Sequence, residues 1–126
     1  MNTATINVVL DATDQALERG LKDLWFPVLP SAHVRENPVS IRRLGHKIAL
    51  WRDQDGRIHA LEDHCPHRGA PLSLGVILGD RIACPYHGVE VREDGTVTRV
   101  PGSPGCKLEG SKATRRFHAT ESNGAI

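Results

Sequence analysis

The sequence predicts an all-β fold, a small antiparallel sandwich or barrel with a short helix before it. Short segments of alternating apolar residues are separated by glycine-containing turns, which is typical of such folds. The 126 residues suffice for one domain with a real core and are too few for two. Because the chain has two Trp, one Tyr and two Phe, its core must be mostly aliphatic.

The N-terminal part is the one region with a helical pattern. Residues 1–25 are expected to form a helical leader, with the helix itself over residues 13–25. Leucines recur there at helical spacing, at Leu17, Leu21 and Leu24. The two prolines of the sequence FPVLP follow and end this pattern.

After the prolines the pattern changes to β. Residues 40–63 are expected to form two strands around a turn at residues 53–56, since Ile48 and Leu50 alternate with Ala49 and Trp51. Further strands are expected over residues 80–84, 89–93, 96–100 and 115–121. Asn123-Gly124 is a strong hairpin signal near the last residue, so we expect the domain 1–126 to come from a longer polypeptide.

Composition excludes several classes of function. Sixteen Lys and Arg balance fifteen Asp and Glu, so no basic surface for nucleic acid is expected. No run of apolar residues is long enough for a membrane span, and the first residues do not resemble a signal peptide. Three cysteines do not make a disulfide framework, which favours a reducing cytoplasm.

Two short motifs carry the chemistry. Cys65 and His67 stand one residue apart, Cys84 and His87 stand two apart, and sixteen residues separate the pairs. Both pairs lie in proline- and glycine-rich loops that leave predicted strands, so four ligands can meet. Two metal sites fit a set of two Cys and two His: a structural zinc ion, or a two-iron cluster in which two His replace two Cys on one iron.

The spacing of these motifs, with Gly69 and Gly88 after the ligands, resembles the Rieske cluster-binding motif. This resemblance implies a Rieske-type antiparallel β sandwich with a small cluster-binding subdomain, whose loops fall within residues 60–92. It also implies a [2Fe–2S] cofactor. By resemblance, the inner iron is bound by Cys65 and Cys84, and the outer iron by His67 and His87.

The residues around the ligands indicate which Rieske proteins are most similar. Respiratory-chain Rieske proteins carry an extra cysteine in each loop, where this sequence has Ala70 and Tyr86. They also carry hydroxyl donors where this sequence has Val89 and Val91, so a lower potential is expected here. The segments LWFPVLPSAHV, ALWRDQDGRIHALEDHCPHRGAPLSLG and IACPYHGVEVREDGTVTRVPG resemble the N-terminal domain of Rieske non-haem iron oxygenase α subunits.

The resemblance implies one-electron transfer that feeds the mononuclear iron of a ring-hydroxylating or demethylating oxygenase. A reductase or ferredoxin would be the electron donor. By the same resemblance, the acceptor would be the mononuclear Fe(II) of a catalytic domain in a neighbouring subunit of a homotrimer. The domain alone would not turn over substrate. Two alternatives stay open, a stand-alone Rieske ferredoxin and a structural zinc domain.

The remaining candidates have simpler interpretations. An oxygenase needs two His and a carboxylate for its second iron; His59 and His64 are five positions apart on a predicted strand, so we expect them on opposite faces and at the surface. Cys106 is expected to be a free loop thiol. Both tryptophans, Trp25 and Trp51, are expected in the core. An apolar lid over the metal site is expected from Pro71, Leu72 and Leu74.

Overall fold

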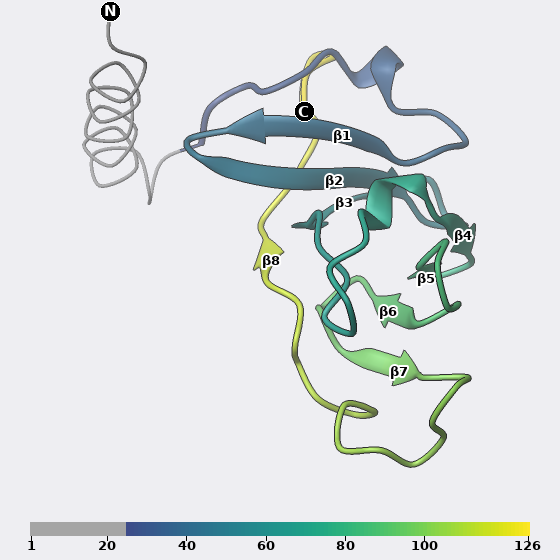
Figure 1. Ribbon diagram of the computed structural model, residues 1–126. Coiled ribbons are helices and arrows are strands. Elements are labelled where there is room, and N and C mark those ends of the chain that lie inside the picture. Colours follow the sequence, from purple (N-terminus) through teal and green to yellow (C-terminus); the bar gives the residue numbers. More distant parts are fainter. Residues whose placement is uncertain (1–24) are drawn as a thin grey trace, which may run out of the picture.

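Two four-stranded antiparallel sheets organise the part of the chain that the computed structural model describes, residues 25–126 (Figure 1). The first sheet has the order β1-β2-β3-β8, with bounds Val39–Arg43, His46–Arg52, Ile58–Glu62 and Arg116–Phe117. The second has the order β4-β5-β6-β7, with bounds Val76–Leu78, Arg81–Ala83, Glu90–Arg92 and Val97–Arg99. Two 3-10 helices, η1 (Ser31–His33) and η2 (Leu72–Leu74), complete the elements.

Strand β2 is buried on both of its faces. Ala49 and Trp51 have no exposed surface and face the second sheet, where they join a core with residues of β5, β6 and β7. Ile48 and Leu50 face the opposite way, into a second core that also contains the C-terminal Ile126. Side chains alternate along a strand, so one strand supplies both cores. The alternation expected from the sequence is therefore confirmed.

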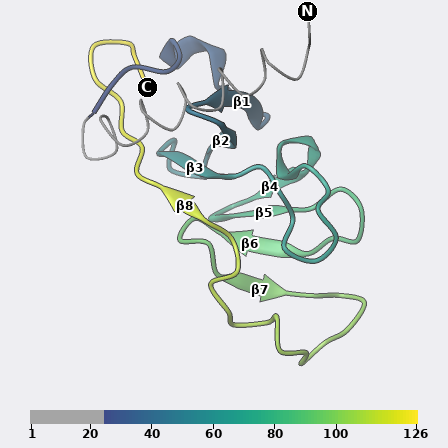
Figure 2. The ribbon, with the colours of Figure 1, turned by 60° about the vertical axis from the view of Figure 1, so that its left-hand side comes forward.

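The first core holds the two sheets together. It contains Trp51 and Leu61 from the first sheet and Ile82, Val91 and Val97 from the second. Burying a side chain of this size stabilises the fold by about 1.5–3 kcal/mol relative to an exposed one. Figures 1 and 2 show the resulting arrangement, with β1, β2 and β3 lying over β4 to β7. The all-β antiparallel sandwich is confirmed.

The last residues of the chain return to its first described residues. Asn123 and Gly124 both have positive φ, of 52° and 78°, and Ser122 and Ala125 exchange two main-chain hydrogen bonds across them. This is the hairpin turn that Asn-Gly favours. The C-terminal Ile126 then bonds to the main chain at Val28 and Leu29, which covers the second core.

Arg52, at the end of β2, links three other segments of the chain. Its guanidinium donates to the carbonyl oxygens of Ser31, Val34 and Gly56, at 3.0, 2.7 and 3.0 Å. The same group forms a bidentate ion pair with the carboxylate of Glu121. One side chain thus joins the N-terminal segment, the β2–β3 turn and the C-terminal segment.

The four strands predicted in the second half of the chain correspond to β5, β6, β7 and β8, but the predicted number of strands was too low in both halves. Residues 40–63 contain a second turn, at Leu44-Gly45, so this segment makes three strands and not two. Strand β4 was not predicted; it has three residues, and only Gly75 separates it from η2. The strand expected over residues 115–121 pairs only at Arg116 and Phe117.

Two expectations concern the N-terminal part. The predicted helix 13–25 and the leader fall almost wholly on residues 1–24, which lie outside the described residues. Trp25 is 70% exposed, so its prediction as a core residue was wrong, whereas Trp51 is confirmed as one. Within residues 25–126, no helix is both long and apolar enough to span a bilayer.

The Arg52–Glu121 pair predicts a pH-dependent stability. The hydrogen bonds that Arg52 donates to its carboxylate lower the pKa of Glu121 from 4.5 to about 2. A carboxyl group with a lowered folded-state pKa contributes stability above its unfolded pKa and loses it on acidification. Glu121→Gln should therefore lower the unfolding midpoint at pH 6, and the difference from the unmodified protein should shrink between pH 4.5 and pH 2. A difference that stays constant over this range in thermal unfolding would show that the pair is not the cause.

Gly95, in the β6–β7 turn, predicts a steric effect. It has a φ of 88°, and a Cβ there would lie 2.1 Å from the carbonyl oxygen of Thr114. Gly56 has a similar φ of 78°, but a Cβ there meets nothing within 4 Å. We expect Gly56→Ala to cost about 1–2 kcal/mol of unfolding free energy through backbone strain alone. Gly95→Ala should cost about 3 kcal/mol or more, because the main chain at Thr114 must also move. Equal losses in urea unfolding would contradict the clash.

Candidate metal centre

The four predicted ligands lie on two loops with the same main-chain hydrogen bonds. In the first loop, the Cys65 N–H donates to the Ala70 carbonyl and the Gly69 N–H donates to the Cys65 carbonyl, both at 2.8 Å. In the second, the Cys84 N–H donates to Val89 and the Gly88 N–H donates to Cys84, at 2.8 and 3.0 Å. The two loops are therefore copies of one local structure.

A glycine with positive φ closes each loop. Gly69 has a φ of 82° and Gly88 has a φ of 70°. Both values lie in the left-handed region, which side chains with a Cβ avoid. Each glycine is the fifth residue of its loop, counted from the cysteine. Its left-handed conformation turns the chain so that its own N–H donates to the carbonyl of that cysteine. The two CPxxG-like sequences thus specify the loops themselves.

The two sulfur atoms are buried together beneath these loops. Cys65 is 2% exposed and Cys84 is 4% exposed, and both belong to the core between the sheets. Burial raises the pKa of the Cys65 thiol, and its hydrogen bond with the Cys84 sulfur raises it further. The backbone N–H groups of His67 and Arg68 lower that pKa by hydrogen bonding to the Cys65 sulfur. The loop therefore already directs main-chain donors at this sulfur.

The two imidazoles lie together on the outside. His67 and His87 are both exposed, and their ring centroids are 5.3 Å apart at an interplanar angle of 85°. The ring of Tyr86, which is 67% exposed, contacts His87 edge-on with centroids 4.2 Å apart. The predicted sulfur ligands are therefore buried and the predicted nitrogen ligands lie at the surface, on loops that follow β3 and β5 (Figure 2 shows these strands).

Two valines stand at the positions where respiratory-chain Rieske proteins carry hydroxyl donors, and both belong to the core. Val89 and Val91 follow the second loop and have no exposed surface. Ala70 packs against the same core from the first loop. Neither valine side chain has a polar hydrogen, so neither donates to the sulfur pair. The environment on this side of the loops is apolar, as expected.

The predicted apolar lid is only partly correct. Leu72 is fully buried and packs in the same core as both cysteines. Leu74 is 71% exposed, so it does not belong to a lid. The two are two residues apart in η2, which is less than one 3-10 turn, so they point in different directions and only Leu72 faces inward. Cys106 is a free thiol, as expected, but it is half-buried against the core.

Sequence reasoning missed a contact that involves Asp63. This carboxyl group is 5% exposed and accepts two hydrogen bonds from Ser73, from its N–H at 2.7 Å and from its Oγ at 2.6 Å. The signal in the sequence was an acidic residue at the end of a buried strand, two positions before a cysteine. Its partner is ten residues away, and no local pattern identifies it.

The histidines considered for a second iron do not form a site. His59 is half-buried, bonds to Asp53 at 2.7 Å and packs against Trp51 with the two rings tilted by 45°, so its prediction as a surface residue was wrong. His64 is exposed, as predicted. Between residues 25 and 126, no three His, Cys, Asp or Glu side chains gather closely enough to hold one metal ion.

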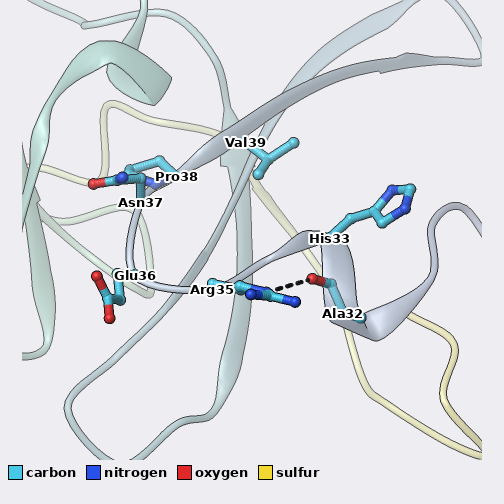
Figure 3. Close-up of a pocket in the computed structure, with 7 residues that line it drawn as sticks. All are labelled: Ala32, His33, Arg35, Glu36, Asn37, Pro38 and Val39. Carbon is cyan, nitrogen blue, oxygen red and sulfur yellow. Dashed lines mark hydrogen bonds between the residues drawn. The ribbon is translucent and has the colours of Figure 1, made fainter.

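Two hollows on the surface contain none of the predicted ligands. The first hollow has a volume of about 470 Å³ and is lined by residues between Ala32 and Val39. Figure 3 shows that two of these side chains, His33 and Glu36, point away from each other. The one hydrogen bond drawn there joins Arg35 to the carbonyl of Ala32, at 3.2 Å. The other, of about 670 Å³, is an apolar groove on the outer face of the first sheet, between Ile48 and Phe117.

Comparison with known proteins gives one consistent family. The model of the Rieske [2Fe-2S] domain matches residues 24–111. The chain is 40% identical over 101 residues to the oxygenase component of chloroacetanilide N-alkylformylase from Rhizorhabdus wittichii, covering 80% of this chain and 28% of that protein. It is 37% identical over 98 residues to the chloroplastic chlorophyllide a oxygenase of Chlamydomonas reinhardtii, covering 77% and 15%.

A solved structure has the same fold. The crystal structure of dicamba monooxygenase bound to dicamba superposes with a TM-score of 0.74 at 33% identity, covering 82% of this chain and 30% of that one. The chain thus spans less than a third of each of these three proteins. The matched region includes both loops, so the chain belongs to the Rieske [2Fe–2S] domain family, whose cofactor is a [2Fe–2S] cluster.

Proposed function

We propose that residues 1–126 form a single Rieske domain that passes one electron at a time to the mononuclear Fe(II) of an oxygenase. When bound, the [2Fe–2S] cluster supplies the one-electron redox couple. The observation that carries the proposal is the separation of ligands: two buried sulfurs and two exposed imidazoles on a pair of loops with the same hydrogen bonds.

The donor set fits a cluster with two unlike irons. In this proposal Cys65 and Cys84 hold the inner iron, because their sulfurs are adjacent and buried in the core. His67 and His87 hold the outer iron, because their rings lie side by side at the surface. A zinc ion would instead need all four side chains around one point. The division into a sulfur pair and a nitrogen pair favours the cluster.

The proposed cluster site is closed to solvent on one side and open on the other. The core behind the sulfurs consists of apolar side chains such as Leu72 and Val91, which exclude water from that side. The exposed edges of His67 and His87 face the solvent, where a partner protein can approach them. Electrons should therefore enter and leave through the imidazoles.

The oxygenase setting is supported by the three similar proteins described above, each of which is named as an oxygenase, a monooxygenase or an oxygenase component. We propose a ring-hydroxylating or demethylating oxygenase with a reductase or ferredoxin as electron donor. The acceptor iron would lie in a catalytic domain, in a neighbouring subunit if the protein forms a homotrimer, and the protein would work in the cytoplasm. A stand-alone Rieske ferredoxin would use the same ligands and differs in its acceptor.

Spectroscopy tests the cofactor and its ligands. The purified protein should be coloured, contain two irons and two sulfides per chain, and give an EPR signal at low temperature after dithionite reduction. Cys84→Ser should lose the cluster, whereas Cys106→Ser should keep it, because Cys106 lies outside both loops. A colourless protein with one zinc per chain would instead support the structural zinc domain.

Replacing an imidazole by a thiolate tests the charge at the outer iron. Two thiolates and two imidazoles leave an oxidised [2Fe–2S] site formally neutral, and His67→Cys adds one negative charge. Adding an electron then becomes harder, so the midpoint potential should fall by on the order of 100 mV or more. His33→Cys, at an exposed histidine outside the loops, is the matched control and should leave the potential unchanged. An unchanged potential in His67→Cys with the cluster bound would refute the ligand assignment.

A further inference from the structure

The two cluster loops are alike inside but are held differently at their ends. The second loop is closed by sheet pairing, because Ala83 and Glu90, which flank Cys84 and Val89, are register partners in β5 and β6. The first loop has no such pair. Strand β3, which leads into it, pairs with β2 and β8, and the segment that follows it is the 3-10 helix η2.

The contact between Asp63 and Ser73 lies where the missing strand pair would be. Asp63 is the first residue after β3, and Ser73 is the middle residue of η2. Both carboxyl oxygens of Asp63 are used by Ser73, one by its N–H and the other by its hydroxyl. The Asp63 N–H in turn donates to the carbonyl of Lys47 in β2, at 2.9 Å. The middle of η2 is thereby fastened to the first sheet.

We propose that Asp63 and Ser73 are positioning residues for the first cluster loop: their two hydrogen bonds replace a strand pair and fix Cys65 and His67 relative to the second loop. The same fastening holds Leu72, the neighbour of Ser73, against the sulfur pair in the core. This inference rests on the proposed cluster site. It assigns to a buried carboxyl group and a hydroxyl group a role in the geometry and water exclusion of that site.

Ser73→Ala is the most direct test, because it removes one of the two bonds without changing the charge. The N–H bond to Asp63 remains, so the variant should fold and bind its cluster. Ser111→Ala is the matched control. Ser111 is also half-buried, and its Oγ donates to the carbonyl of Leu108 at 2.6 Å, outside both loops. Ser73→Thr keeps a hydroxyl group and should restore the behaviour of the unmodified protein.

Three measurements report on the loop and not on stability alone. In Ser73→Ala, iron should be released to a ferrous chelator about fivefold faster than in Ser111→Ala, the change expected for one hydrogen bond. The midpoint potential should rise, because water admitted to the site stabilises the more negative, reduced form. In the cluster-free protein, amide hydrogen exchange over residues 64–72 should accelerate, while that over residues 84–89 should not.

The outcomes separate this inference from the proposed function. If the unmodified protein binds no [2Fe–2S] cluster, the proposed function fails and the loop measurement on the cluster-free protein still stands. If the cluster is bound and Ser73→Ala matches Ser111→Ala in iron release, potential and exchange, the positioning role is wrong while the cluster assignment holds. A loss of thermal stability with unchanged potential and iron release would likewise show a purely structural contact.

Discussion

The burial of β2 on both faces is the constraint on which the other features of this domain depend. A strand at the surface of a sandwich needs apolar residues at alternate positions only, but β2 needs them at four successive positions, from Ile48 to Trp51. One face of β2 packs against the second sheet. The other face is covered by the segment before β1 and by the segment after β8, which contribute Val34 and Ile126. Arg52, directly after this run, then fixes the covering segments with its guanidinium group.

The proposed metal site lies on the face of β2 that meets the second sheet. The core beneath Trp51 includes both cysteines, so the sulfurs are buried by the same packing that joins the sheets. The loops rise from the edge of this core and carry the imidazoles outward. Positions close to the fold's centre are rigid, and positions at the loop tips are accessible. The two kinds of proposed ligand therefore have different surroundings, one buried and one accessible, which is what the proposed electron transfer at a surface requires.

Much of this could be predicted from the sequence because it is encoded locally. The loop shape follows from a proline after each cysteine and a glycine after each motif, and the Asn-Gly turn needs only its own two residues. What could not be predicted depends on partners that are distant in the chain. Trp25 has no pattern that distinguishes it from Trp51, and the surroundings of His59 depend on Asp53 across a turn. The short strand β4 exists only because β5 pairs with it.

The different fastening of the two loops also has a consequence for how the sequence can change. The second loop is closed by main-chain bonds between β5 and β6, which survive almost any substitution except proline. The first loop depends on two particular side chains, and most single replacements at either one remove a bond. The two loops have nearly the same shape but differ in their tolerance to mutation. Substitutions around the first loop must preserve an acceptor at position 63 and a hydroxyl donor at position 73.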